Sequence, residues 1–294
     1  MPLTVADAFD QFLPTLTTSF TETQSAASHR ASIEARLQTD FGMKTMFRTG
    51  SFGAGTNVRY YSDVDYFAVI PTANLKANSA SSLAAVAEAL RARFPNTPNI
   101  RVNAPGVQVP FGVDGSETVE IIPVDETGKT RLGFRQFDIP DGFGGWKFSA
   151  PESHKAYVDD IDTTLYNKVK PLIRLVKAWK FYRNVPIKSF YLELRVAAYA
   201  KTEKTIVYSI DIKNVLAALW ADQLADFPDP RFPDDNFRVS ACTSATSRTD
   251  ALSKLSNAVL WSQQGMDDEH ALRPGGAIAR WNILYDGRFP HYGP

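Results

Sequence analysis

The fold of this chain is decided by Thr49–Ile70, TGSFGAGTNVRYYSDVDYFAVI, a stretch that joins a glycine-rich turn to an apolar strand. Gly50 and Ser51 begin the turn, and two further glycines let backbone N–H groups face an anion without interference from a Cβ atom. Ser51 and Thr56 add hydroxyl donors. The turn is therefore predicted to be a phosphate-binding loop.

Two carboxylates introduce the apolar strand that follows. Asp63 and Asp65 stand two residues apart at the head of the run Tyr66–Ile70. Because a strand has a period of two, both side chains leave the same face, about 7 Å apart along the strand. Such carboxylates suit a pair of hard divalent cations, which lie about 4 Å apart in two-metal sites. The alternative is a glycine-rich hairpin with two solvated aspartates.

The joined motif resembles a known family. Gly50-Ser51, a spacer and Asp63-Val64-Asp65 before an apolar strand are similar to the polymerase-β-like nucleotidyltransferases. With Gly55-Thr56 included, the string resembles the branch of the oligoadenylate synthases, cGAS and the bacterial DncV-type enzymes (CD-NTases). The resemblance implies an α+β fold, in which a nucleotidyltransferase lobe with a small mixed sheet and a helical carboxy-terminal lobe flank a cleft.

The family also implies a third acidic residue on a neighbouring strand. Val107–Val113 and Thr118–Val124 are predicted as strands, and Glu120 stands in the second of them. Adjacent strands lie about 4.8 Å apart, so Glu120 is expected to complete the carboxylate set, although aspartate is more usual in the family. Asp125 is the rival and has the opposite strand parity. A solvated glutamate on one sheet face is the remaining alternative.

The second half of the chain is predicted to be helical from about Asp160. The strings PLIRLVKAWK and IKSFYLELR resemble a carboxy-lobe segment in which a lysine and a serine contact the donor triphosphate and an aromatic ring stacks on the base. Position by position, these roles fall on Lys177, Ser189 and Phe190. The alternatives are a solvated helix lysine, an N-cap serine and a core phenylalanine.

Chain length and patterning predict two lobes, residues 1–160 and 161–294. Thr4–Phe41 carries apolar residues at helical spacing and is predicted to form one or two helices, counted with the first lobe. The family resemblance implies that an amino-terminal helix braces the back of both lobes. Gly133–Lys155 has no stable period and is predicted to be irregular. Its part from Gly145 to His154 resembles a cleft-lining loop of the bacterial enzymes, which implies a candidate wall for the acceptor substrate. Further helices are predicted around 212–224, 246–261 and 277–284.

Composition limits the classes of partner. The 294 residues include 32 basic and 32 acidic side chains. This balance argues against a protein whose main function is to bind long nucleic acid. One cysteine, Cys242, and four scattered histidines provide neither an internal disulfide nor a structural zinc site. No signal peptide or membrane span is expected, and a cytoplasmic monomer fits the pattern.

The resemblance implies an enzyme that joins ribonucleoside triphosphates, ATP among them, into a cyclic di- or trinucleotide with release of pyrophosphate. Asp63, Asp65 and Glu120 would hold two Mg²⁺ ions, for which Mn²⁺ can substitute. The product would be a second messenger that activates an effector in bacterial antiphage (CBASS) signalling. Two alternatives stay open: nucleotidyl transfer to RNA or protein, and a catalytically inactive nucleotide-binding relative.

Overall fold

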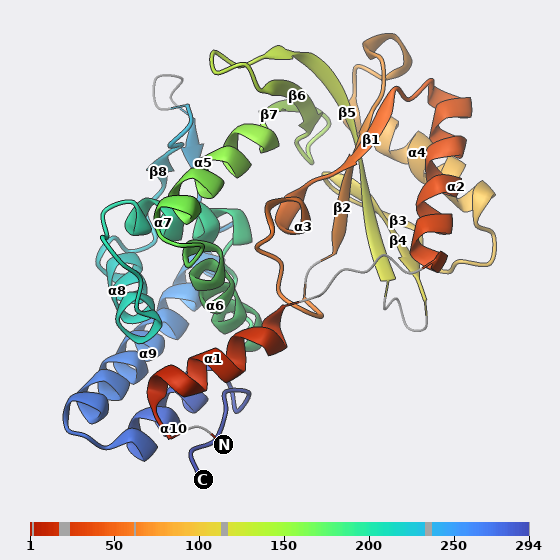
Figure 1. Ribbon diagram of the computed structural model, residues 1–294. Coiled ribbons are helices and arrows are strands. Elements are labelled where there is room, and N and C mark those ends of the chain that lie inside the picture. Colours follow the sequence, from red (N-terminus) through yellow and green to blue (C-terminus); the bar gives the residue numbers. More distant parts are fainter. Residues whose placement is uncertain (2, 18–23, 62, 113–116, 233–236, 294) are drawn as a thin grey trace. The chain divides into compact units, whose positions relative to one another are not determined.

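The computed structural model describes residues 1, 3–17, 24–61, 63–112, 117–232 and 237–293. The chain divides into two compact units that interleave along the sequence. The sheet unit comprises Ser19–Gly55 and Ser62–Ala156, and the helical unit comprises Met1–Thr18, Thr56–Tyr61 and Tyr157–Pro294. Both units are shown in Figure 1.

The described part of the sheet unit contains a seven-stranded mixed sheet with the path β1-β2-β5-β4-β3, which β6 and β7 extend from β5. Its strands are β1 (Thr45–Arg48), β2 (Val64–Val69), β3 (Arg101–Asn103), β4 (Gly106–Phe111), β5 (Glu117–Lys129), β6 (Arg135–Pro140) and β7 (Trp146–Ser149). Strands β2 and β5 are parallel, whereas the other pairs are antiparallel. The predicted strands Val107–Val113 and Thr118–Val124 correspond to β4 and β5 and are confirmed. The turn predicted between them falls in residues 113–116, which lie outside the described part.

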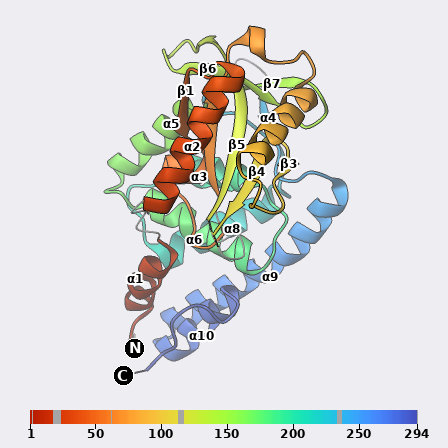
Figure 2. The same cartoon turned by 90° about the vertical axis from the view of Figure 1, so that its right-hand side faces the viewer.

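Two helices, α2 (Gln24–Phe41) and α4 (Ser79–Arg93), cover one face of this sheet (Figures 1 and 2). They bury apolar side chains of alternate strand residues, such as Ala68 of β2 and Ile121 of β5. The residues of opposite parity, Phe67 and Ile122 among them, form a separate cluster. Alternation along β2 therefore puts Asp65, two residues before Phe67, on the face that α2 and α4 leave uncovered.

The segment that was predicted to be irregular is ordered in the structure. Within 133–155, β6 and β7 form an antiparallel pair, and α5 (Pro151–Thr164) begins directly after them. The cause is tertiary: β6 pairs with the long strand β5, and Phe137 is fully buried against the sheet. The prediction of an irregular conformation here is wrong, because backbone pairing supplied the order that the side-chain pattern lacks. The assignment of the segment as a wall for the acceptor stays a prediction.

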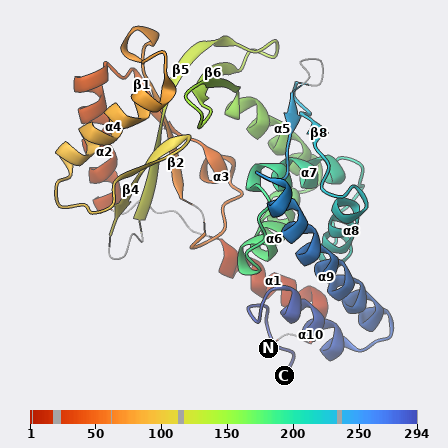
Figure 3. The same cartoon turned by 180° about the vertical axis from the view of Figure 1, so that it is seen from behind.

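The helical unit is built from α1 (Val5–Leu16), most of α5, α6 (Val169–Tyr182), α7 (Ser189–Ala200), α8 (Tyr208–Ala221), α9 (Ala245–His270) and α10 (Pro274–Leu284). Figure 3 shows α9 running beside α8 and α10. A short strand pair, β8 (Phe227–Pro228) with β9 (Arg238–Val239), completes the unit. No helix in the described ranges is long and apolar enough to span a bilayer.

The amino-terminal segment forms two helices that belong to different units. Helix α1 packs the aromatic rings of Phe9 and Phe12 against Trp281, Tyr285 and Phe289 of the helical unit. Helix α2 packs on the sheet. The compact units therefore differ from the predicted lobes 1–160 and 161–294, since α1 and Thr56–Tyr61 belong to the helical unit, which resumes at Tyr157. Helix α1 joins that unit because its apolar partners lie at the far end of the chain.

Candidate active site

Acidic side chains meet where β2 runs parallel to β5. Asp65 lies directly opposite Glu120 in this ladder, so their side chains leave the same face of strands about 4.8 Å apart. Asp63 immediately precedes β2. Gln108 of β4 lies opposite Glu120, and its Nε2 donates to Asp63 Oδ2 at 3.3 Å. The sheet therefore brings the three predicted carboxylates into one neighbourhood.

Two glycines leave room for these carboxylates. A Cβ atom at Gly50 would stand 1.8 Å from Asp65 Oδ2, and Gly50 has a φ of 59°, which disfavours side chains. A Cβ atom at Gly106 would stand 2.5 Å from Glu120 Cγ. Both positions thus require glycine because a carboxylate occupies the space that a methyl group would take.

The predicted phosphate-binding loop is a short helix in the structure. Gly50–Ala54 forms α3, which Thr49 precedes and which Gly55 ends in the left-handed conformation, with a φ of 73°. Gly50 and Ser51 lie in its first turn, where the helix itself offers the N–H groups no acceptor. The expectation of an open loop is therefore wrong, but N–H donors still gather at Gly50 and Ser51.

Burial, together with like charges at Glu120, raises the pKa of two carboxyl groups in this neighbourhood. Burial, then the adjacent Asp65 carboxylate and finally Asp63 raise the pKa of Glu120 to about 8. Loss of hydration also raises the pKa of Asp63, against the opposing effects of the Gln108 hydrogen bond and of Arg101. A nearby cation would favour the ionised form of each carboxyl group.

The residues present fit a divalent metal ion by the chemistry of their donors. Glu120 Oε1 is buried, and no hydrogen-bond partner for it exists in the described part of the chain. It lies beside Asp65, and carboxylate oxygens are the ligands that hard cations prefer. Within the same described ranges, no three acidic, histidine or cysteine side chains are already gathered as a metal site. The inference of a cation therefore rests on the carboxylate oxygens of Asp65 and Glu120, not on a preformed set of metal ligands.

We expect Glu120→Gln to raise the Tm in EDTA at pH 8 by about 2–4 °C, since it removes a buried carboxylate from beside Asp65. In EDTA, the stability of the unsubstituted protein should fall as pH rises from about 4.5 to about 8, because the folded state retains a proton that the unfolded state releases. Calorimetry at pH 5, 6.5 and 8 measures both effects. Glu126→Gln, exposed on the same strand, is the control; an unchanged pH slope in Glu120→Gln would contradict the prediction.

Asp125, the rival to Glu120, has other partners. Its Oδ1 and Oδ2 accept from Thr72 Oγ1 at 3.0 and 2.8 Å, next to the 3₁₀ turn η1 (Thr72–Asn74). In the ladder it lies opposite Asp138 of β6, five residues along β5 from Glu120. The strand-parity argument against Asp125 therefore agrees with its position.

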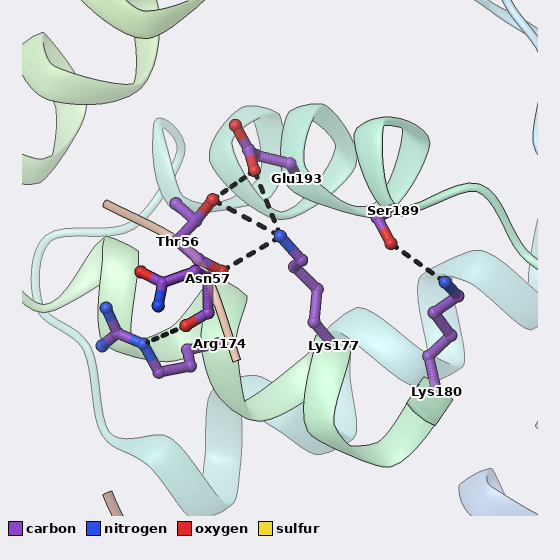
Figure 4. A network of polar contacts seen from close by, with 7 residues as sticks. All are labelled: Thr56, Asn57, Arg174, Lys177, Lys180, Ser189 and Glu193. Atoms are coloured by element: carbon purple, nitrogen blue, oxygen red, sulfur yellow. Dashed lines mark hydrogen bonds and ion pairs between the residues drawn. The ribbon is translucent and has the colours of Figure 1, made fainter. Parts of the chain in front are cut away.

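In the helical unit, the start of α7 presents polar and aromatic groups. Ser189 is the first residue of α7, and its Oγ accepts from Lys180 Nζ at 2.9 Å (Figure 4). Burial and then Lys177 lower the pKa of Lys180 to about 8. Phe190 is 44% exposed, which excludes the alternative of a core phenylalanine. The sequence reasoning missed Lys180, for which a position one turn beyond Lys177 on the same helix was the available signal.

Lys177 and Thr56 lie inside the helical unit instead of on its surface. Lys177 is 1% exposed and Thr56 is fully buried. The ammonium contacts the carbonyl oxygen of Thr56 at 3.0 Å and the carboxylate of Glu193 at 3.6 Å (Figure 4). The alternative of a solvated helix lysine is thereby excluded, because Lys177 is buried and bonded to Thr56 and Glu193.

Three solved structures share this architecture. CdnC of Escherichia coli MS115-1 with ATP has a TM-score of 0.75 at 18% identity, covering 97% of this chain and 98% of that one. DncV, the cyclic AMP-GMP synthase of Vibrio cholerae, has 0.75 at 13%, with 98% of each chain covered. The CdnE cyclic dinucleotide synthase of Elizabethkingia meningoseptica has 0.63 at 23%, covering 88% of this chain and 98% of that one. At these identities the likeness establishes the fold, a polymerase-β-like α+β architecture with a helical carboxy-terminal part.

Sequence comparison identifies the family. A "Probable cyclic nucleotide synthase" of Bacillus cereus (strain VD146) is 30% identical over 80 residues, which span 27% of this chain and only 24% of that relative. The family described as the Second Messenger Oligonucleotide or Dinucleotide Synthetase domain matches residues 3–161, more than half of the chain. As the Gly50-Ser51 and Asp63-Val64-Asp65 motif predicts, the chain belongs to this family of cGAS/DncV-like nucleotidyltransferases.

Proposed function

We propose that this protein joins ribonucleoside triphosphates, ATP among them, into a cyclic di- or trinucleotide second messenger. The observation that carries the proposal is the pairing of Asp65 with Glu120 across parallel strands, with Asp63 held beside them. Family membership supplies the reaction class. Nucleotidyl transfer as the reaction class rests on that membership, whereas the cyclic nature and the size of the product are what we propose.

The reaction needs a ribose hydroxyl to attack the α-phosphorus of a second nucleotide. A new phosphorus–oxygen bond forms, the bond to the β-phosphate breaks, pyrophosphate leaves and the hydroxyl proton is released. Asp63, Asp65 and Glu120 would hold Mg²⁺ or Mn²⁺, which when bound neutralises phosphate charge and lowers the pKa of a ligated hydroxyl. Gly50 and Ser51 would orient phosphate oxygens through N–H and hydroxyl donors.

For the helical unit, we propose that Lys180 and Ser189 contact the donor triphosphate and that Phe190 stacks on a base. Burial supports Lys180 over Lys177, because Lys180 is only partly buried and already touches Ser189. An ammonium is a compact charge that neutralises phosphate, and the first turn of a helix adds N–H donors. Thr56, which the sequence predicts as a hydroxyl donor to phosphate, is left out of the proposed site because it is fully buried and donates to Glu193.

We expect Lys180→Met to raise the KM for nucleoside triphosphate about tenfold, because a tenfold change corresponds to the loss of one charge-assisted hydrogen bond. Steady-state rates of pyrophosphate release measure the change. Lys180→Arg keeps the charge and should lie near the unsubstituted value. Lys170→Met, on the same helix but paired with Asp159 at 2.6 Å, is the matched control. A rise in KM of the same size in both methionine variants would contradict the assignment.

The function itself is tested with the purified protein, all four ribonucleoside triphosphates and Mg²⁺ or Mn²⁺. Phosphatase-resistant products are separated and weighed by mass spectrometry, beside an Asp63→Ala, Asp65→Ala double variant. Cyclic masses that require the intact carboxylates are the expected result and identify the bases. Pyrophosphate release without small cyclic products would point to labelling of RNA or protein, and nucleotide binding without turnover to an inactive relative.

The biological setting is part of the same proposal. We infer from the family resemblance that the product activates an effector in bacterial antiphage (CBASS) signalling. The equal numbers of basic and acidic residues support small nucleotides as substrates over long nucleic acid. Product extracted from cells that carry the gene, assayed before and after phage challenge, tests this setting.

A further inference from the structure

One short segment of the chain interrupts the sheet unit. Thr56–Tyr61 belongs to the helical unit, although the segments before and after it, Ser19–Gly55 and Ser62–Ala156, both belong to the sheet unit. The same six residues connect α3, which begins at Gly50, to β2, which begins at Val64. They are therefore the covalent link between the candidate phosphate-binding turn and the carboxylate strand.

Helix α6 holds this segment by its main chain. Lys177 Nζ donates to the carbonyl oxygen of Thr56 at 3.0 Å, and Arg174 Nε donates to that of Asn57 at 2.9 Å (Figure 4). The two cations stand three residues apart and so share one face of the helix. Thr56, Asn57 and Val58 are all buried. Both hydrogen bonds are made to backbone carbonyl groups, so they do not depend on the side chains of Thr56 and Asn57.

Glu193 of α7 completes the arrangement. Its Oε2 accepts from Thr56 Oγ1 and lies 3.6 Å from Lys177 Nζ. Lys177 and Glu193 are 1% and 9% exposed, so each charge depends on the other for compensation. An ammonium has three N–H donors, and three oxygens already surround this one: two of Thr56 and one of Glu193. The geometry commits Lys177 to the protein interior.

We propose that Lys177 and Glu193 are positioning residues for nucleotidyl transfer and do not contact the nucleotide. By fixing Thr56, they hold one end of the link that joins α3, which begins at Gly50, to the strand that follows Asp63 and contains Asp65. A misplacement of about 1 Å at reacting groups can cost about a hundredfold in rate. The inference rests on the proposed function, which it deepens by assigning the buried ion pair to the placement of the carboxylates.

The test compares Glu193→Gln, Lys177→Met and the double variant with the unsubstituted protein. Each single variant should lower kcat ten- to fiftyfold while the KM for nucleoside triphosphate stays within twofold. The affinity for Mn²⁺, followed by electron paramagnetic resonance without nucleotide, should fall several-fold. The effects should be non-additive, because both substitutions break one network. The double variant, which leaves no uncompensated charge, keeps the test valid should a single variant fail to fold.

Two results would overturn the proposal. One is a rise in KM for nucleotide confined to Lys177→Met with kcat retained, which marks a direct phosphate contact. The other is a Glu193→Gln variant with unchanged kcat and unchanged Mn²⁺ affinity. Lys170→Met controls for loss of a lysine from α6. Should the unsubstituted protein make no product, the proposed function fails, yet the Mn²⁺ affinities still decide whether the ion pair positions the carboxylates.

Discussion

Asp65→Asn is expected to lower the rate of pyrophosphate release by at least about a thousandfold, which corresponds to roughly 4 kcal/mol of lost transition-state stabilisation. The substitution keeps the size and shape of the side chain but removes the charge that faces Glu120 across the parallel pair. Amide oxygens are weaker ligands for a hard cation than carboxylate oxygens are. Single-turnover rates at saturating nucleotide and Mg²⁺ measure the loss.

The control for this prediction is Asp125→Asn. Asp125 is also a carboxylate of this sheet, but it accepts from Thr72 and lies on β5 five residues beyond Glu120. Its replacement should change the rate less than about threefold, the size of an ordinary surface effect. Equal losses in the two variants, or an active Asp65→Asn protein, would remove Asp65 from the proposed metal ligands.

Gly50→Ala is expected to lower activity about a hundredfold, because it displaces groups that take part in the reaction. The variant should remain folded. The added Cβ atom would lie 1.8 Å from Asp65 Oδ2, so the short aspartate side chain must turn away from its present position. Strain at a φ of 59° adds about 1 kcal/mol of destabilisation. Product formation and thermal unfolding of the variant measure the two effects separately.

Gly287→Ala separates backbone strain from displacement of the carboxylate. Gly287 has a φ of 79°, and a Cβ atom there meets nothing within 4 Å. Both variants should therefore lose a similar amount of stability, but Gly287→Ala should retain activity within about twofold, since nothing moves at the carboxylates. An equal activity loss in both would show that the glycine conformation, and not the position of Asp65, accounts for the effect.

Much of the sheet unit follows from local pattern. The period of two in β2 and β5 predicts which faces Asp65 and Glu120 occupy, and the ladder places them opposite one another. The helical pattern likewise predicts α6 and α7. These predictions succeed because alternation and apolar stripes are local consequences of which side chains are buried.

Other features depend on partners far away in sequence. The turn after Thr49 is a helix in the structure, and β6 and β7 are ordered by pairing with β5 and with each other. Lys177 was predicted to face phosphate, whereas its ammonium contacts Thr56, 121 residues earlier in the chain. The sequence around a lysine on a predicted helix gives no local sign of whether the lysine will be buried and whether a carboxylate will compensate its charge.

The sequence by itself determined the family, the α+β class and the candidate carboxylates Asp63 and Asp65, because a glycine turn before an acidic, apolar strand is a compact local motif. Glu120 followed from the family resemblance and from the strand predicted around it. Only the tertiary structure decided that α1 and Thr56–Tyr61 belong to the helical unit, and that Lys177 is buried while Lys180 meets Ser189. The physical reason is that burial and ion pairing depend on the whole folded chain. Glu193 neutralises Lys177 only after α6, α7 and the Thr56 segment have packed together.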